Sequence, residues 1–369
     1  MKKVKELRNM GTLKFIDERL EDYNANEFLN ELFMASKYLG VLEGKISGYQ
    51  FNSILIPLLH KKEAASSMYI EGTQTTISDL FEDDISQRNT TNKVRIEVNN
   101  HTRAIVYATE YLKNENFSHR FMQNLHRIML NGILPKSKTH TLGKYKTENN
   151  KIVNSYGTTV YIPPAYTETK KYMDELIDYM NDSNDGINPL IKAAIIHSQF
   201  ESIHPFDDGN GRVGRLLITL YLYKAKVINA PFFYISEAIS QDKSVYYSKL
   251  TDSRNNSYDE WIKFFLKKCI VQATKHIDYI ESLNDLYKRT KITLQNTINS
   301  PKFDLIIDCL FTHPILTSTY LSERINVTIG QAKRYLDTLE DVHILSGDDR
   351  RRNRLYYFVD LLDLARRNN

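Results

Sequence analysis

The twelve residues 204–215, HPFDDGNGRVGR, constrain the fold of this chain more than any other stretch. Within them, Gly209 and Gly211 flank Asn210, and an apolar pattern of helical spacing follows at once. A glycine-bearing loop that runs into a helix leaves backbone N–H groups unpaired at the positive end of the helix dipole. The stretch therefore predicts a loop-to-helix junction that binds an anion.

The charged and titratable side chains of the same stretch suit a polyphosphate. Arg212 and Arg215 stand at positions i and i+3, so both project from one side of the first helical turn and supply charge-assisted donors. Asp208 precedes the helix and is suited to hold a Mg²⁺ that bridges phosphate oxygens. His204 lies four residues earlier, close enough to take a proton from an incoming nucleophile. These residues predict a site that binds charge, positions an acceptor and removes a proton.

Two other interpretations of this stretch compete with a polyphosphate site. Taken alone, the glycines would indicate only a turn, the histidine an ordinary loop residue and the arginines a solvated face. Their occurrence together within twelve residues favours a phosphate-binding site. Residues 209–214 also satisfy the spacing GxGxxG of dinucleotide-binding folds, which requires a preceding strand and an acid about 20 residues later. Here residues 189–203 have a helical pattern, and the first acid well downstream is Glu237. The motif GxxxxGK[ST] does not occur, which excludes a P-loop NTPase.

The composition indicates an ordinary globular protein. A length of 369 residues suggests two or three domains, and a net charge of +4 is too small to imply nucleic-acid or membrane binding. Cys269 and Cys309 are too far apart for a CxxC pair, which predicts buried free thiols. No apolar run reaches the ~20 residues of a transmembrane helix, and the N-terminus has no signal-peptide core. A reducing cytoplasm is the expected compartment.

The apolar pattern predicts a mostly α-helical chain with a β-hairpin in its middle. The hairpin is expected at 141–164, with strands at 143–146 and 158–162, and Pro57 is expected to end or kink the second helix. Expected helices cover 26–43, 54–70, two within 91–131, 167–180, 188–203, 212–227 and 258–285. These elements predict an N-terminal helical region at 1–95, a core at 96–285 and a C-terminal domain at 300–369.

The order of elements after residue 300 is that of a winged helix-turn-helix. Helices are expected at 303–312, 317–324 and 328–340, with Thr328 as an N-cap, followed by strands at 344–346 and 355–359. Arginines at the tip between the strands fit phosphate contacts on DNA, while nearby acids weaken that case and leave a scaffold or oligomerisation role open. The arginines are Arg350, Arg351, Arg352 and Arg354, and the acids are Asp337, Glu340, Asp341, Asp348 and Asp349.

The stretch at 204–215 resembles the signature of the Fic family, HPFx[D/E]GNGRxxR, and matches it at every specified position. Similar flanks are Leu125-His126, Tyr161-Ile162-Pro163-Pro164, and Tyr246-Tyr247 followed by Trp261 and Phe264-Phe265, so the resemblance spans roughly residues 25–270. It implies a Fic-type helical core that transfers AMP from ATP to a Tyr, Thr or Ser hydroxyl of a protein, with pyrophosphate leaving. The hairpin would act as a flap that pairs with an extended segment of the target.

The resemblance also implies roles for individual residues. His204 would be the general base, Asp208 would coordinate Mg²⁺, and Arg212 and Arg215 would bind the outer phosphates. Gly211 would favour nucleotidyl transfer, with UMP or phosphocholine as open alternatives to AMP. The implied ATP-binding residues are Glu71, His204, Gly209, Asn210, Gly211, Arg212, Val213, Gly214, Arg215 and Tyr246, the last on the adenine side.

A second motif precedes the core. Gly72 predicts a helix stop, which leaves Glu71 against the negative end of the dipole at a cost of about 0.3–1 kcal/mol and suggests an arginine partner. An ordinary exposed glutamate is the alternative. Residues 67–72 resemble the inhibitory helix of some Fic proteins, [S/T]xxxE[G/N], here expected at about 58–72, with Ser67 and Glu71 on one face. The resemblance implies that Glu71 pairs with Arg215 and occupies the γ-phosphate site.

The expected partners are ATP and a target protein that docks at 141–164. Removal of AMP as a second activity, self-modification, a homo-oligomer and DNA binding at 300–369 are left open, and no membrane partner is expected. The rival from another functional class is a DNA-binding regulator in which the Fic core acts as a sensor.

Overall fold

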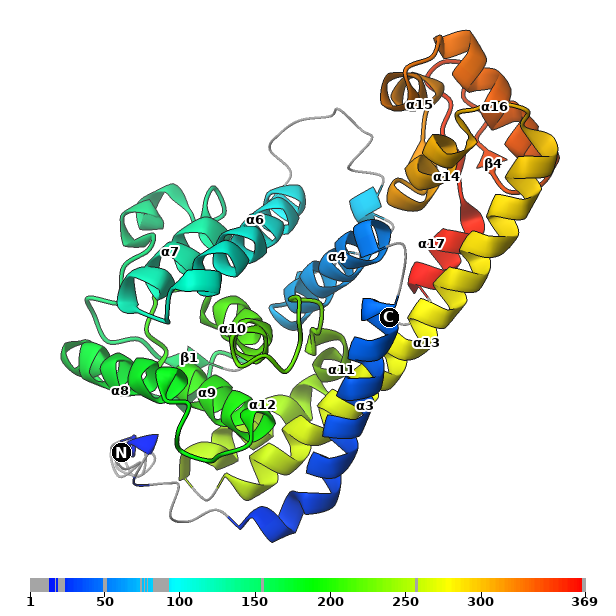
Figure 1. The fold of residues 1–369 in the computed structure, drawn as a ribbon. Helices are drawn as coiled ribbons and strands as arrows, with labels where there is room; N and C mark the ends of the chain where they lie inside the picture. Colours follow the sequence, from blue (N-terminus) through cyan, green and yellow to red (C-terminus); the bar gives the residue numbers. More distant parts are fainter. Residues whose placement is uncertain are drawn as a thin grey trace.

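The computed structural model describes residues 13–16, 18, 24–48, 52–73, 75, 77, 79–81, 93–153, 156–255 and 258–366. The N-terminal start of the chain and the last three residues of the predicted C-terminal domain lie outside this part. The chain is mostly helical, as predicted, with two small antiparallel sheets (Figure 1). Before residue 300 the elements are η1 (Ala25–Phe28), α3 (Leu29–Ser47), α4 (Asn52–Ile70), α6 (Lys93–Asn114), α7 (His119–Leu130), η2 (Lys136–Thr141), β1 (Ile152–Val153), β2 (Thr159–Tyr161), η3 (Tyr166–Glu168), α8 (Thr169–Asn181), α9 (Pro189–Ile203), α10 (Asn210–Lys224), α11 (Ser236–Ser240), α12 (Lys243–Asn255) and α13 (Asp259–Thr297).

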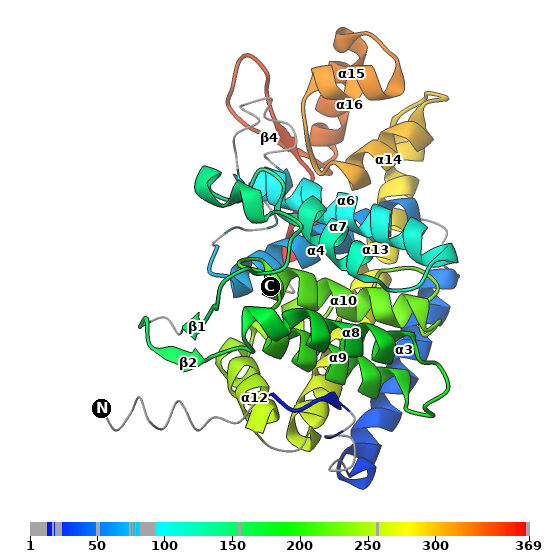
Figure 2. The ribbon, with the colours of Figure 1, turned by 90° about the vertical axis from the view of Figure 1, so that its left-hand side faces the viewer.

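The helices α9 and α10 form the centre of the core. Every residue of α9 from Leu190 to Ile203 is buried, which explains why its sequence is apolar on all sides. Helices α8, α12 and α13 pack against α9, and α4, α6 and α7 pack against α10 (Figures 1 and 2). The short loop between α9 and α10, which carries the conspicuous motif, is therefore supported by helices from most of the chain.

The long helix α13 joins this core to the C-terminal unit (Figure 1). The sequence predicted its end at residue 285, but the helix continues to Thr297 because Tyr287, Thr290 and Leu294 remain buried. Its later turns pack against the elements that follow residue 300, and α3 lies along its earlier turns. No helix in the described part of the chain combines the length and the apolar character needed to cross a membrane.

The C-terminal unit contains the three predicted helices and the predicted pair of strands, each shifted by two residues at most at its start. A third strand and a final helix, which the sequence did not predict, complete it. The three strands form an antiparallel sheet in the order β3-β5-β4, and Thr328 Oγ1 accepts from Gln331 N as the N-cap of α16. The elements are α14 (Phe303–Thr312), β3 (Ile315–Leu316), α15 (Ser318–Ile325), α16 (Ile329–Asp341), β4 (Ser346–Gly347), β5 (Tyr356–Tyr357) and α17 (Val359–Arg366).

The first strand of the predicted hairpin was misplaced, and Pro57 does not end the second helix. The first strand of the hairpin is β1, at Ile152–Val153, and residues 143–146 form no strand. The N–H of Lys146 instead donates to Pro205 O at 2.8 Å, so this segment pairs with the loop between α9 and α10. Helix α4 continues through Pro57. A proline removes one N–H, and near the start of a helix that loses a single hydrogen bond to the first turn.

Candidate functional site

The loop between α9 and α10 begins at His204, whose backbone is left-handed, with φ 48° and ψ 60°. Such a conformation is uncommon for a residue other than glycine, and it turns the chain sharply out of α9. The loop ends at Gly209, which has φ 78° and is the N-cap of α10. A Cβ at Gly209 would lie 2.7 Å from Leu130 Cδ2, so glycine is needed here for both conformation and space.

The loop is held in shape from inside and from α7. Asn210 accepts from Phe206 N at 2.9 Å and donates to Phe206 O at 2.8 Å, so both ends of its amide are engaged by the loop itself. His126 donates from Nε2 to Asp208 O at 3.0 Å, while its Nδ1 accepts from Gly143 N at 2.9 Å. Its ring stacks on Phe206 at 4.0 Å. Burial lowers the pKa of His126 to about 4, so the ring is neutral, and its two hydrogen bonds fix its tautomer and hold the loop.

The imidazole of His204 is neutral at physiological pH. Burial, followed by the nearby cations Lys146 and Arg254, lowers its pKa to about 4. A neutral imidazole has a lone pair available to accept a proton, which a general base requires. The histidine predicted as a base is therefore in the correct protonation state.

Arg215 is buried and bound to two residues of α4. Its side chain is 2% exposed, and its Nη2 lies 2.7 Å from Glu71 Oε1. Nε and Nη2 also donate to Ser67 Oγ at 3.1 and 3.0 Å, and Nη2 to Ser67 O at 3.1 Å. Burial opposes the ionisation of Glu71, but Arg215 outweighs it and the pKa of Glu71 lies below its usual range. The pair implied by the resemblance is present, and a Cβ at Gly211 would overlap Glu71 Oε1.

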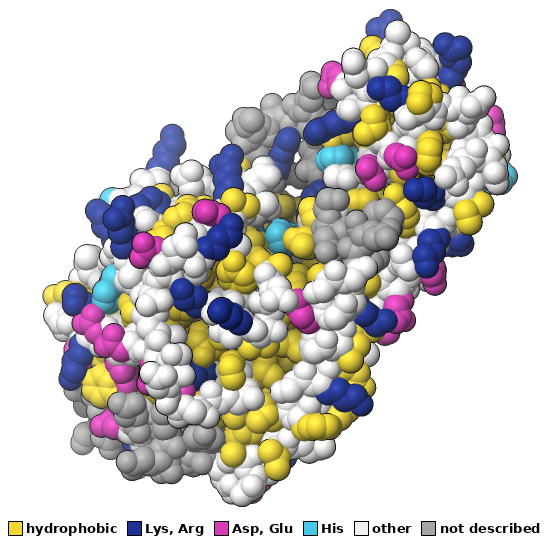
Figure 3. All heavy atoms as spheres, in the orientation of Figure 1, with side chains coloured by type: hydrophobic (Ala, Val, Ile, Leu, Met, Phe, Trp, Pro, Cys, Tyr) yellow, Lys and Arg dark blue, Asp and Glu magenta, His cyan; other side chains and the backbone are white. Residues whose placement is uncertain are grey.

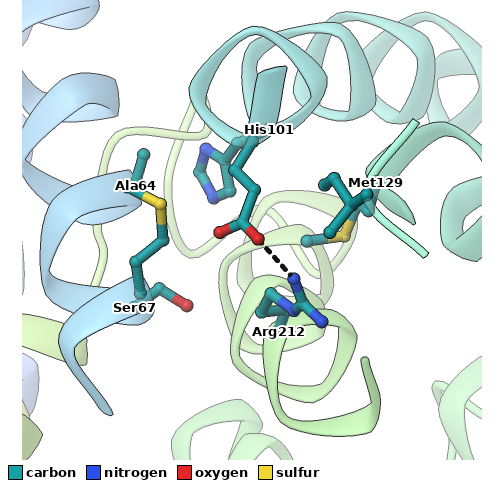
Figure 4. A pocket seen from close by; sticks show the side chains of 8 residues that line it. Ala64, Ser67, His101, Met129 and Arg212 are labelled. Carbon is teal, nitrogen blue, oxygen red and sulfur yellow. Dashed lines mark hydrogen bonds and ion pairs between the residues drawn. The ribbon is translucent and has the colours of Figure 1, made fainter. Parts of the chain in front are cut away.

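Arg212 is held between two carboxylates. Its Nη1 lies 3.0 Å from Glu97 Oε1 and its Nη2 lies 3.1 Å from Asp208 Oδ1. Figure 4 shows the ion pair of Arg212 at one side of a small cavity, with Ser67, Ala64 and His101 around it. Glu97, on α6, joins this ion-pair group although no motif in the sequence marks it.

Three of the residues predicted to bind ATP, Val213, Gly214 and Tyr246, face the protein interior, and their role in binding stays a prediction. Val213 is fully buried in the core, and Gly214 faces α9, where a Cβ would stand 2.5 Å from Glu201 Oε1. Tyr246 is 1% exposed, with its hydroxyl bonded to His197 Nε2 at 2.8 Å. Its neighbour Tyr247 is 43% exposed and donates to Ile70 O at 3.4 Å, so Tyr247 is the tyrosine available to a ligand.

The donor set suits a metal ion that is completed by substrate. Among the described residues, no three His, Cys, Asp or Glu side chains gather closely enough to hold a metal by themselves. Asp208, whose side chain is 44% exposed, offers one carboxylate at the mouth of the loop. Mg²⁺ is commonly bound by one or two carboxylates together with substrate phosphates and water, and Asp208 fits that pattern.

Comparison with known proteins agrees with this geometry. A model of the Fic/DOC family matches residues 116–222, and a model of the Fic/DOC family N-terminal region matches residues 29–110. A probable protein adenylyltransferase of Aquifex aeolicus is 29% identical over 130 residues, which cover 29% of this chain and 40% of that protein. A protein adenylyltransferase of Nematostella vectensis is 30% identical over 105 residues, covering 28% of this chain and 23% of that protein. The chain thus spans less than half the length of these relatives.

Solved structures show the same fold. A Fic family protein from Desulfovibrio desulfuricans G20 has a TM-score of 0.57 and 18% identity, covering 91% of this chain and 97% of that one. A Fic domain containing signaling protein from Bacteroides thetaiotaomicron has a TM-score of 0.53 and 22% identity, covering 66% of this chain and 97% of that one. Residues 116–222 of this chain are thus a Fic/DOC family domain, preceded at residues 29–110 by the N-terminal region of the same family.

Proposed function

We propose that this chain is a protein adenylyltransferase that transfers AMP from ATP to a hydroxyl side chain of a target protein. The observation that carries the proposal is the loop between α9 and α10. A neutral His204 stands at its start, free N–H groups of Gly209 to Gly211 lie at the N-terminus of α10, and arginines stand in the first turn. The curated relatives that match this chain are named protein adenylyltransferases.

The chemistry follows from the order of these groups. The hydroxyl oxygen of the target attacks the α-phosphorus while its proton passes to the His204 imidazole. The bond from the α-phosphorus to the bridging oxygen breaks, and pyrophosphate leaves with the electron pair. Backbone amides of the loop and Arg212 and Arg215 stabilise the charge that moves onto the phosphates. The products are the AMP ester of the target and pyrophosphate.

Asp208 would hold Mg²⁺ in this site. When bound, the ion neutralises charge on the phosphate oxygens and orients them. Only Oδ1 of Asp208 pairs with Arg212, so the carboxylate would have its second oxygen to offer the ion.

We further propose that Glu71 keeps the enzyme inactive. Arg215 donates four hydrogen bonds to Ser67 and Glu71 and its side chain is 2% exposed, so it is not available to a γ-phosphate while α4 is in place. ATP would then bind without productive geometry. Removal of AMP from a modified target is the alternative activity of the same site, and it is tested together with AMP transfer.

For the C-terminal unit we propose a winged-helix classification, supported by its helix order and its sheet order β3-β5-β4. A role in DNA binding is less well supported. Arg354 binds both carboxylate oxygens of Glu340 at 2.9 and 2.8 Å, and Arg350 pairs with Asp348. On the face that Figure 3 shows, acidic and basic side chains are interspersed over this unit. Two of the four predicted arginines therefore stabilise the unit itself.

The test is incorporation of label from ATP labelled at the α-phosphate, with Mg²⁺, into the purified protein and into proteins of a lysate. Glu71→Gly should increase incorporation, and His204→Ala in the same background should abolish it. A labelled target treated afterwards with unmodified enzyme reveals removal of AMP. If Glu71→Gly labels nothing and also fails to bind MgATP in calorimetry, the proposed function is wrong.

A further inference from the structure

Four consecutive backbone carbonyls around His204 accept hydrogen bonds from two residues of the predicted flap, Lys146 and Asn150. Lys146 Nζ donates to Ile203 O at 3.1 Å, and Lys146 N donates to Pro205 O at 2.8 Å. Asn150 Nδ2 donates to His204 O at 3.0 Å and to Phe206 O at 3.2 Å. Every carbonyl from 203 to 206 thus has a partner outside its own loop.

The two residues also hold each other. Lys146 Nζ lies 3.0 Å from Asn150 Oδ1, and the Lys146 side chain is buried, with 3% of the residue exposed. A buried ammonium costs free energy unless it has partners; here these oxygens accept its hydrogen bonds and the Asp207 carboxylate favours its charged form. Burial lowers its pKa to about 8. Lys146 is therefore a buried, hydrogen-bonded lysine, whereas the nearby lysines at 138 and 144 are exposed.

The contacts matter because of the backbone that they hold. His204 has a left-handed conformation, which costs free energy for a residue with a Cβ and persists only where the surroundings impose it. The side-chain direction of a residue follows its φ and ψ. Hydrogen bonds to the carbonyls before, at and after His204 therefore fix where its imidazole points.

We propose that Lys146 and Asn150, here named the carbonyl clamp, are positioning residues that set the His204 imidazole and link it to the flap. The clamp residues precede β1 in the chain, and β1 pairs with β2 in the flap. A target segment that binds along the flap thus acts on the same polypeptide stretch that holds the base. The expected effect of the clamp on turnover rests on the proposed function, whereas its expected effect on the His204 pKa does not.

Lys146 also acts on His204 through its charge. The groups that face the imidazole electrostatically are the cations Lys146 and Arg254, the carboxylate Glu71, and α9 through a hydrogen bond at Glu201. The two cations favour the neutral imidazole and Glu71 opposes them. Loss of the Lys146 charge should therefore raise the pKa of His204, a change that a purely structural lysine far from the ring would not cause.

The experiment uses the full chain with Glu71→Gly as the parent. The variants are Lys146→Met, which removes the charge and its donors, Lys146→Arg, which restores a cation, and Asn150→Ala, which removes two donors without changing charge. Lys138→Met is the matched control, because Lys138 is exposed and has no role in the clamp. Two quantities are measured: the His204 pKa, by NMR of labelled histidine assigned with His204→Ala, and turnover of α-labelled ATP, counted as labelled protein plus released AMP.

The expected results separate the clamp from a general loss of structure. Turnover should fall about 10- to 100-fold in Lys146→Met and Asn150→Ala, as expected for a displaced catalytic group, while calorimetric MgATP affinity stays the same. Lys146→Arg should recover part of the turnover. The His204 pKa should rise in Lys146→Met alone. Turnover and pKa equal to those of Lys138→Met, or MgATP affinity lost in parallel with turnover, would overturn the inference.

The two hypotheses fail in different ways. A parent that binds MgATP and turns none over contradicts the proposed function, and the NMR pKa then decides the clamp by itself. If Lys146→Met does not fold, the turnover of Asn150→Ala tests the clamp instead. The His204 pKa is then measured in Lys146→Arg, where it must equal that of the parent because the cation is kept.

Discussion

Glu71→Gln tests whether the ion pair between Glu71 and Arg215 inhibits the enzyme, with the smallest change in side-chain shape. Glutamine keeps the size of the side chain and removes the charge that faces Arg215 Nη2 at 2.7 Å. If the ion pair competes with the γ-phosphate for Arg215, the variant should transfer AMP faster at saturating MgATP, because a larger fraction of bound nucleotide takes the productive position.

The size of the effect follows from the contact. A hydrogen bond to a charged group contributes about 1.5–3 kcal/mol. Since 35% of the Glu71 side chain is exposed, solvent screening places this pair at the lower end, at about 1.5 kcal/mol. One tenfold step in an equilibrium corresponds to about 1.4 kcal/mol. Glu71→Gln should therefore increase the rate about tenfold, and Glu71→Gly further, because glycine also removes the bulk beside Gly211.

The assay is the initial rate of label incorporation from α-labelled ATP, with Glu110→Gln as the control. Glu110 also pairs with a cation, Lys113, but its side chain is 72% exposed on α6, away from Arg215. A rate for Glu71→Gln equal to that of the control, in protein that His204→Ala still inactivates, would show that the ion pair does not inhibit the enzyme.

Three further perturbations probe other parts of the site. His126→Ala should lower the free energy of unfolding by about 2–3 kcal/mol, because two buried hydrogen bonds and the stacking on Phe206 are lost, and calorimetric Tm measures this. Burial raises the pKa of Glu63 and of Glu201 from 4.5 to about 7. Between these two pH values the folded state therefore keeps a proton on each carboxyl that the unfolded state has released. Stability is therefore present at low pH and falls as pH rises through about 7, by at most about 3 kcal/mol per group; Tm should be lower at pH 8 than at pH 5, and Glu201→Gln should reduce the difference. Chelation of Mg²⁺ with EDTA should abolish label incorporation by Glu71→Gln, and Asp208→Ala should weaken MgATP binding in calorimetry without weakening that of metal-free ATP.

Elements with a strong apolar period could be predicted from the sequence, and elements defined by contacts could not. The helices α9 and α10 and the loop between them are encoded locally, by the apolar run, the glycines and the proline at the N-terminus of α9. The strand at 143–146 was misassigned because its β-branched and aromatic neighbours match a strand, while the partner of Lys146 is a loop carbonyl far along the chain. The end of α13 was misplaced because the surface that covers its last turns comes from the C-terminal unit.

The same distinction applies within the site. The motif identified His204, Arg212 and Arg215 because their roles depend on spacing within one loop and one helical turn. Tyr246 and Tyr247 are adjacent and identical, and only the packing of α12 against α9 decides which of the two is buried. Glu97 becomes part of the site only when α6 packs against α10, which no local pattern reveals.

The charges of the site imply that nucleotide binding is an exchange of anions. Arg215 is bound by Glu71, and Arg212 by Glu97 and Asp208. A nucleotide therefore gains only the difference in free energy between a phosphate and a carboxylate as the partner of each arginine. In the proposed site a γ-phosphate, which carries more charge and more acceptor oxygens than a carboxylate, competes with Glu71 for Arg215, whereas AMP has no outer phosphate to compete. In calorimetry, MgATP should therefore bind more tightly than ADP and ADP more tightly than AMP, and Glu71→Gly should widen the gap between ATP and ADP. Equal affinities for the three nucleotides in that variant would mean that Arg215 does not contact the outer phosphates.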